Sequence, residues 1–139
     1  MTDAVIDAVA LAHHFRDSLP TAAERVFTDA EEGRSHLYLP EIALGEFIYT
    51  ALRGRLRVRN PDWVVSELLD QIRGSGYLHL SSLGPSGWGV FLRLEVPELH
   101  DRMIAADALS RGLPVVTNDP ELQTVSGLRT IWKATRQPS

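Results

Sequence analysis

The stretch HDRMIAADALSRGLPVVTND, residues 100–119, decides the fold more than any other part of this sequence. Its first half carries apolar residues at helical spacing and ends at a glycine, which predicts a helix from Pro97 to Gly112. Its second half predicts a short buried strand at residues 115–117, and Asp119 follows that strand closely. A helix joined by a tight turn to a buried strand is typical of α/β folds. We therefore expect this unit to place a carboxylate at the end of a strand.

The remaining sequence continues this alternation of short strands and helices. Strands are predicted at residues 4–7, 36–39, 77–80, 115–117 and 130–132, the last at a sheet edge. Helices are predicted at residues 9–19, 21–32, 40–53, 61–73, 84–96 and 97–112. Thr21 and Glu24 fit a capping box at the start of the second helix. Because strands that alternate with helices are joined by right-handed crossovers, the sequence predicts an α/β fold with a parallel sheet of four to five strands.

Length and composition fit one ordinary globular domain. The chain has 139 residues, of which 44% are hydrophobic and 23% are charged. We expect a single domain at residues 1–135, followed by a disordered tail at residues 136–139. No apolar run approaches the roughly 18 residues of a membrane span, and the first residues are acidic, unlike a signal peptide. We therefore expect a cytoplasmic protein with no membrane partner.

Charge and cysteine content narrow the possible chemistry. The formal net charge of −4 argues against a surface that is basic throughout, although it is compatible with a local basic patch. The sequence has no cysteine, which excludes disulfides and thiolate metal ligands. Any metal ion must therefore be bound by oxygen or imidazole ligands.

Two carboxylates lie where predicted strands end. Asp7 ends the first strand, and Asp119 follows the strand at residues 115–117. In open α/β sheets ligands gather at the carboxyl ends of strands, so both residues are candidates for a functional site. Both also suit the N-cap of a following helix, with Pro120 suited to the first helical position after Asp119. The sequence leaves both interpretations open.

Two further carboxylates lie on apolar helix faces. Glu46 lies in the interior of a helix that has no other interior charge, and it is costly there unless paired, hydrogen-bonded or bound to a metal ion. Asp101 shares the apolar face of its helix and lies in the first turns, where the helix dipole favours negative charge. A buried salt bridge to an arginine remains an alternative for Glu46. A capping or dipole-stabilising role remains an alternative for Asp101.

Three polar residues near Asp101 have simpler interpretations. Asp107 points away from the apolar face and has Arg111 four residues later, which predicts a surface ion pair. Glu98 lies close enough to serve as a reserve ligand, but it better fits a first-turn helix acid. His100 is expected to be structural or exposed.

Four carboxylates in one pocket would repel one another, and some would stay protonated without a positive charge nearby. A divalent cation relieves this repulsion, and an oxygen-only ligand set favours Mg²⁺ or Mn²⁺. Thr117 lies near enough to orient a carboxylate or a water molecule through a hydrogen bond. The candidate catalytic and metal-binding residues are therefore Asp7, Glu46, Asp101 and Asp119, with Thr117 as a further catalytic candidate.

Four stretches of the chain share a pattern with one known family: VID at residues 5–7, LPEIALGE at 39–46, HDRMIAADAL at 100–109 and LPVVTND at 113–119. With these stretches, which occur in the family's order, the sequence resembles the PIN-domain ribonuclease family, and most closely the VapC-type toxins of toxin–antitoxin systems. The resemblance implies a three-layer α/β/α fold with a central parallel sheet, cleavage of RNA and homodimers. In toxin members it also implies inhibition by a cognate antitoxin protein.

The resemblance carries the family's acidic ligands onto the four carboxylates already identified, and the family's hydroxyl onto Thr117. One position departs from the family, because Ala8 follows Asp7 where the family usually has serine or threonine. A hydrogen bond close to the metal ligands is then absent, although the ligands themselves are intact. The hypothesis is hydrolysis of an RNA phosphodiester by water activated at one or two metal ions.

Four arginines alternate directly after the helix that carries Glu46. If that segment is extended, Arg53, Arg55, Arg57 and Arg59 all point one way and could bind several RNA phosphates. A solvated loop or an antitoxin contact remains an alternative for this row.

Three other functions compete with a toxin nuclease. A phosphoacceptor receiver domain fits poorly, because Asp7 has no adjacent acid and the strand at residues 77–80 is followed by serines. A catalytically inactive PIN-fold protein that binds RNA or acts as a scaffold is compatible with Ala8 but not favoured by the complete acidic set. An RNA-processing nuclease without a toxin role has the same site, and a neighbouring antitoxin gene would distinguish the two.

Overall fold

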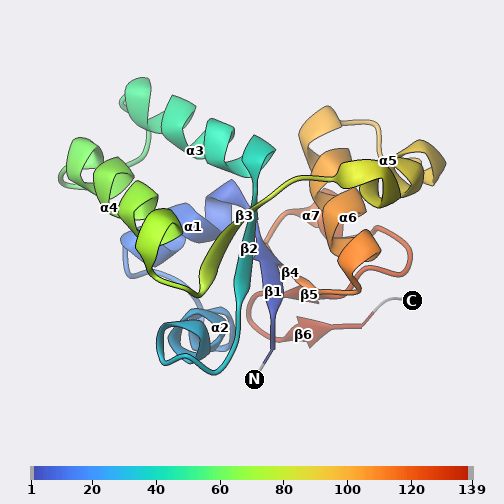
Figure 1. The fold of residues 1–139 in the computed structure, drawn as a ribbon, viewed down its shortest axis with the longest axis horizontal. Coiled ribbons are helices and arrows are strands. Elements are labelled where there is room, and N and C mark those ends of the chain that lie inside the picture. The colour runs from blue at the N-terminus through green and yellow to red at the C-terminus, as the bar shows by residue number, and fades with distance from the viewer. Residues whose placement is uncertain (1, 138–139) are drawn as a thin grey trace.

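The computed structural model describes residues 2–137, in which strands and helices alternate along most of the chain (Figure 1). The strands are β1 Ala4–Ile6, β2 Leu37–Pro40, β3 Leu78–Ser81, β4 Val115–Val116, β5 Thr130–Ile131 and β6 Thr135–Arg136. The helices are α1 Ala8–Phe15, α2 Thr21–Glu31, α3 Glu41–Leu52, α4 Pro61–Gly74, α5 Gly84–Arg93, α6 Leu99–Arg111 and α7 Pro120–Gln123.

The strands form one sheet in the order β3-β2-β1-β4-β5-β6. The first five strands in this order are parallel, and β6 pairs antiparallel with β5. The chain therefore builds outward from β1 toward β3 on one side and from β4 toward β6 on the other. This topology makes the boundary between β1 and β4 the switch point of the sheet, where open α/β folds bind ligands.

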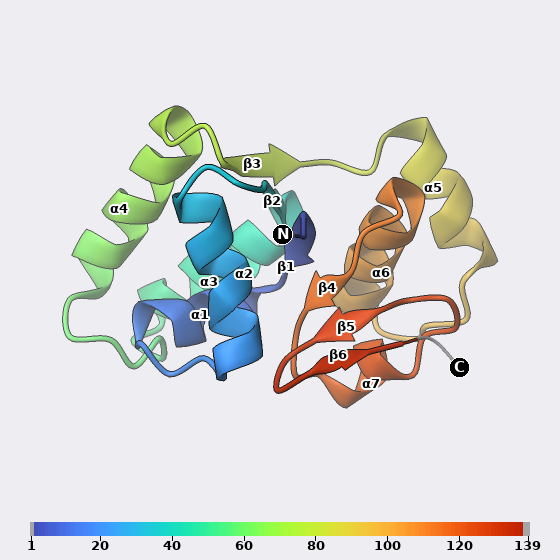
Figure 2. The same cartoon turned by 90° about the horizontal axis from the view of Figure 1, so that it is seen from below.

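Helices cover both faces of the sheet, which confirms the predicted three-layer α/β/α fold (Figures 1 and 2). Helices α1 to α4 lie on one side of the sheet, and α5 and α6 lie on the other. The central strands carry apolar side chains at successive positions because they are buried on both faces. The side chains with 0% exposure in these strands include Val5, Ile6, Leu37, Leu39, Val115 and Val116.

The last part of the chain, from β5 onward, differs from the sequence prediction. A sixth strand, β6, pairs Arg136 with Thr130, so the disordered tail predicted from residue 136 is wrong at that residue, and β5 is not the edge strand. The sequence pattern did not predict β6, because this strand has only two residues and both are exposed. The rest of the predicted tail includes residues 138–139, which lie outside the described residues.

Several helix boundaries also differ from the predicted ones. Thr21 is the first residue of α2, and Pro20 occupies the N-cap without a side-chain hydrogen bond, so the predicted capping box does not form. Helix α1 ends early, because Asp17 adopts a left-handed backbone conformation (φ 57°) that stops the helix. Helix α7 was not predicted, although Asp119 and Pro120 were identified as a possible helix start. No helix within residues 2–137 has the length and apolarity to cross a membrane.

Candidate active site

The four candidate carboxylates converge at the switch point of the sheet. Asp7 follows β1 and Asp119 comes shortly after β4, and these strands pair through Val5 with Val115 and Ile6 with Val116. Glu46 comes from the middle of α3 and Asp101 from the first turn of α6, and these two helices contact each other. The negative charges of Asp119 and Glu46 raise the pKa of both Asp7 and Asp101, so the four side chains share one electrostatic environment.

Asp7 is a buried carboxyl group with two hydrogen-bond partners. Its Oδ1 accepts a hydrogen bond of 2.8 Å from the backbone N–H of Ala10, which makes Asp7 the N-cap of α1. Burial raises its pKa to about 6, against the lowering effect of hydrogen bonds from Thr117 and Ala10. The negative charges of Asp119 and Glu46 raise the pKa further. The capping role predicted as an alternative is therefore present, and it coexists with a place in the acidic cluster.

A side-chain hydrogen bond joins Asp101 and Asp119. Burial raises the pKa of Asp101 to about 7, and a hydrogen bond to Asp119 and that residue's negative charge contribute further. Asp119 Oδ1 also accepts a hydrogen bond of 2.9 Å from the backbone N–H of Glu121, which makes Asp119 the N-cap of α7. Thr117, with 0% exposure, accepts a hydrogen bond of 3.0 Å from the backbone N–H of Asp119. Thr117 thus contacts two of the four acids.

Glu46 is half-buried, and one of its oxygens lacks a partner. Burial raises its pKa, and the nearby His100 lowers it. Its Oε1 is buried and has no hydrogen-bond partner among the described residues. No arginine within residues 2–137 forms an ion pair with it, so the alternative of a buried Glu46–arginine salt bridge is wrong.

The donor set fits a divalent cation, although the side chains do not form a complete coordination shell. Within residues 2–137, no group of three or more histidine, aspartate or glutamate side chains is already placed to hold a metal ion. The buried, unpartnered Oε1 of Glu46 is nevertheless an oxygen ligand without a donor. Burial, and next to it the negative charges of neighbouring acids, raise the pKa of Asp7 and Asp101, so their charged forms are poorly compensated. A divalent cation would satisfy both deficits, since carboxylate oxygens are ligands that Mg²⁺ and Mn²⁺ prefer.

Glu98, the residue directly before α6, stabilises the start of that helix. Glu98 is the N-cap of α6, because its Oε2 accepts a hydrogen bond of 2.7 Å from the backbone N–H of Asp101. Its Oε1 lies 2.6 Å from Nδ1 of His100, and this contact raises the pKa of the imidazole. Glu98 is therefore a helix cap that lies beside the acidic cluster.

Asp107 is buried, and its predicted place on the surface is wrong. Only 2% of it is exposed, and its carboxylate accepts hydrogen bonds from Arg111 Nε (2.7 Å) and from Ser81 Oγ (2.6 Å). The predicted ion pair with Arg111 exists within α6, and the hydrogen bond from Ser81 ties α6 to the end of β3. The sequence could not show this, because the face of α6 away from its apolar stripe is covered as well.

The arginine row does not have the geometry that phosphate binding along an extended strand requires. The segment from 53 to 60 contains no strand, and Arg57 has a left-handed backbone conformation (φ 59°). Arg53 lies over the ring of Tyr49 at 5.4 Å from the ring centroid. Arg55 differs from the other three in lining a cavity that also includes Glu46.

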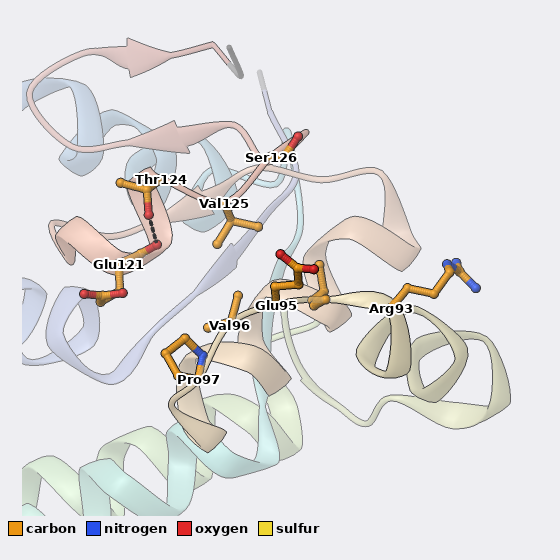
Figure 3. Close-up of a pocket in the computed structure, with 9 residues that line it drawn as sticks. Arg93, Glu95, Val96, Pro97, Glu121, Thr124, Val125 and Ser126 are labelled. Carbon is orange, nitrogen blue, oxygen red and sulfur yellow. Dashed lines mark hydrogen bonds between the residues drawn. The ribbon is translucent and has the colours of Figure 1, made fainter.

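A larger cavity lies beside the acidic cluster. It has a volume of about 420 Å³ and lies between the connection from α5 to α6 and the segment that follows Asp119 (Figure 3). Figure 3 shows the side chains of Glu95 and Glu121 at this cavity, with Val96 and Val125 between them. None of the four candidate carboxylates lines it, so this cavity and the acidic cluster are separate features.

The fold and the site together define a class of protein: an α/β domain with an acidic site at the switch point of a parallel sheet. Comparison with known families places the chain more narrowly. It belongs to the PIN domain family, whose sequence model matches residues 4–128. The predicted membership of this family is confirmed, and PIN domains are generally nucleases that use divalent metal ions.

A solved structure has the same fold. It is described as the crystal structure of VapBC2 from Rickettsia felis bound to a DNA fragment from their promoter. One of its chains matches with a TM-score of 0.70 and 14% identity, covering 94% of this chain and 98% of that chain. At this identity the likeness shows the fold alone. No match was found among curated proteins.

Proposed function

We propose that this protein is a metal-dependent ribonuclease that hydrolyses RNA phosphodiester bonds and acts as the toxin of a type II toxin–antitoxin pair. The nuclease class is supported by membership of the PIN domain family. The toxin role is supported by the structural likeness to a chain of VapBC2, which covers nearly the whole of both chains. RNA is the substrate, and the expected protein partners are a second copy of the chain and a cognate antitoxin.

The observation that carries the proposal is the convergence of four acids from distant parts of the sequence, none of which forms an ion pair with a basic side chain within residues 2–137. The negative charges of Asp119 and Glu46 raise the pKa of both Asp7 and Asp101, and within residues 2–137 Glu46 Oε1 has no hydrogen-bond partner. A group of carboxylates that served only stability would have arginine or lysine partners, as Asp107 has in Arg111. A bound divalent cation would offset the repulsion among the four carboxylates, which is why we infer a metal-dependent role for them.

The four acids would hold Mg²⁺ or Mn²⁺, directly or through water. A divalent cation at such a site supplies Lewis-acid chemistry, lowering the pKa of water and offsetting negative charge on the phosphoryl oxygens. Thr117 positions the site, because its hydroxyl contacts Asp7 and accepts a hydrogen bond from the backbone N–H of Asp119. Asp7 and Asp119 are held in turn by the helix N–H groups they cap, so their orientation is fixed before substrate binds.

The test is cleavage of single-stranded RNA by the purified protein with Mg²⁺, with Mn²⁺ and with a chelator. The Asp101→Asn variant is the inactive comparison, and Asp62→Asn, at an exposed position in the first turn of α4, is the matched control. We expect cleavage by the wild type and by Asp62→Asn that depends on the metal ion, and none by Asp101→Asn. Cleavage that persists in the chelator or in Asp101→Asn would contradict the assignment. Metal-independent RNA binding without cleavage would instead identify an inactive RNA-binding protein.

The toxin role is tested separately in cells. Controlled expression of the wild type should stop growth and generate new RNA ends, and Asp101→Asn should do neither. Active RNA cleavage in vitro with normal growth would indicate an RNA-processing nuclease rather than a toxin.

A further inference from the structure

A small cavity lies directly beside the acidic cluster, between α1 and α3. Its volume is about 220 Å³, and its lining includes Ala8, which follows Asp7, and Glu46. Because one of the four acids and the neighbour of another form part of its wall, the cavity opens onto the candidate site. It is smaller than the roughly 300–1,000 Å³ of pockets for drug-sized ligands, and thus suits one small group of a longer molecule.

Two arginines from different elements line this cavity. Arg16 is the residue after the last turn of α1, and its Nη1 donates a hydrogen bond of 2.9 Å to the backbone carbonyl of Leu56. Leu56 is 1% exposed and therefore anchors the segment that follows α3. The hydrogen bond brings the Arg16 guanidinium to the residue next to Arg55, across 40 positions of sequence.

The position of Arg55 is fixed by a tight turn at the end of α3. Gly54 adopts a left-handed conformation (φ 69°), and the backbone N–H of Arg55 donates a hydrogen bond of 3.0 Å to the carbonyl of Thr50. A residue other than glycine is strained in this conformation, so the turn depends on Gly54. The turn sets Arg55 on the same cavity wall as Arg16, while its side chain stays exposed to solvent.

Neither arginine has a carboxylate partner. Within residues 2–137, no ion pair includes Arg16 or Arg55, and Glu46 pairs with neither, although all three line the cavity. Both guanidinium groups line the same cavity as Glu46 without forming a salt bridge to it, so their charge is available to a ligand. The carboxylates of an acidic site repel the phosphates of an approaching nucleic acid, so positive side chains next to that site are needed to bind it.

We propose that this cavity binds the RNA phosphate next to the one that is cleaved, held by Arg16 and Arg55. The inference rests on the proposed ribonuclease function and names part of its substrate site. Guanidinium groups suit this role because their planar donors match phosphate oxygens in pairs. Arg16 keeps Nη2 and Nε for this purpose, since its only described hydrogen bond uses Nη1. The cavity replaces the extended arginine row as the phosphate site, with Arg55 common to both.

The first experiment measures binding of a fluorescent single-stranded RNA at several salt concentrations, in the absence of divalent metal ions so that no cleavage occurs. Arg16→Gln/Arg55→Gln is compared with Arg57→Gln/Arg59→Gln, which removes two charges from the same region and leaves the cavity lining intact. We expect the first pair to weaken binding about tenfold and to lower the slope of log K against log salt by about 0.7, the value for one phosphate on single-stranded nucleic acid. Equal effects of the two pairs would overturn the proposal.

The second experiment compares substrates of different length in the presence of the metal ion that supports cleavage. A dinucleotide has a single phosphodiester and cannot reach the cavity with a second phosphate. We expect Arg16→Gln/Arg55→Gln to lower kcat/KM for a longer RNA about tenfold and to leave dinucleotide hydrolysis unchanged. An equal loss on both substrates would place the arginines at the reacting phosphate or in the fold, and no loss on either would show that the cavity does not bind RNA; both results would overturn the proposal.

These experiments separate the two proposals. If the wild type cleaves neither substrate, the proposed function fails, while the binding comparison still decides whether the cavity holds a phosphate. Arg55→Gln alone guards against a folding defect, because Arg55 is exposed and its side chain makes no hydrogen bond within residues 2–137. This single variant should show part of the loss, and a wild-type value would count against the proposal.

Discussion

Replacing Asp7 by asparagine should stabilise the metal-free protein while abolishing its activity. Asparagine is nearly the same size as aspartate, and it is an equally good N-cap, so it can keep the hydrogen bond from the backbone N–H of Ala10. The substitution removes only the charge of a carboxylate that is 5% exposed. The stability effect therefore reports the electrostatic cost of that charge.

The size of the effect follows from the raised pKa of Asp7. The difference between the ordinary value of 3.8 and about 6 in the folded protein corresponds to about 3 kcal/mol, since a tenfold change in proton affinity is worth about 1.4 kcal/mol. Because the folded state binds this proton more tightly than the unfolded state, ionisation of Asp7 destabilises the fold. The penalty is absent below about pH 4, develops between the two pKa values and is complete above about pH 6.

Urea unfolding in the presence of a chelator provides the assay. At pH 8, Asp7→Asn should be about 3 kcal/mol more stable than the wild type, which corresponds to roughly 10 °C in Tm for a chain of this size. Near pH 4 the difference should vanish. Saturating Mg²⁺ or Mn²⁺ at pH 8 should stabilise the wild type more than the variant, because a cation offsets the same charge.

The control for this experiment is Asp62→Asn, which removes an exposed charge from the first turn of α4. It should change stability by less than about 1 kcal/mol, the usual size of a helix-dipole effect, and should lose none of the response to metal. The reasoning would be refuted if Asp7→Asn were destabilising at pH 8, or if its effect were the same at pH 4 and pH 8.

Three further outcomes are expected from the same geometry. Glu46→Gln should also raise the stability of the metal-free protein above neutral pH and remove RNA cleavage, because burial raises the pKa of Glu46; chelator-treated unfolding and a cleavage assay measure both. Thr117→Val should reduce cleavage about 10- to 100-fold and Thr117→Ser should restore it, since both contacts of Thr117 with Asp7 and Asp119 depend on the hydroxyl. Asp107→Ala should destabilise the fold by about 2 kcal/mol in urea unfolding and leave the cleavage rate of the folded protein intact, because it leaves Ser81 and Arg111 without their acceptor; a variant as stable as the wild type would show that the buried pair contributes nothing.

The sequence predicted those features that depend on local pattern. Short apolar runs at Val5–Ile6 and Val115–Val116 predicted buried parallel strands, because only strands covered on both faces have apolar residues at successive positions. The position of Asp7 and Asp119 after these strands, together with an unpaired charge at Glu46, predicted the acidic cluster. These inferences needed only periodicity and the rule that strand ends meet at one edge of the sheet.

Features that depend on how helices and strands pack against each other could not be predicted from local sequence patterns. Asp107 looked exposed because its helix has one clear apolar stripe, but α5 and the end of β3 bury the opposite face of that helix. The arginine segment looked extended because its charges alternate, yet the left-handed conformations of Gly54 and Arg57 bend it. Arg16 gave no signal, because its relation to Leu56 depends on how α1 packs against the end of α3.

For the aspartates, a helix-capping role and a place in the acidic cluster do not exclude each other. Asp7 and Asp119 cap α1 and α7, and Asp101 lies in the first turn of α6, so three of the four acids lie at helix N-termini. Backbone N–H groups and the helix dipole stabilise negative charge at these positions. The pKa values of Asp7 and Asp101 are nevertheless raised to about 6 and about 7, so the helices compensate only part of the desolvation and repulsion. The helix N-termini thus orient these carboxylates but compensate their charge only in part, and under the proposed function a bound cation would supply the remaining compensation.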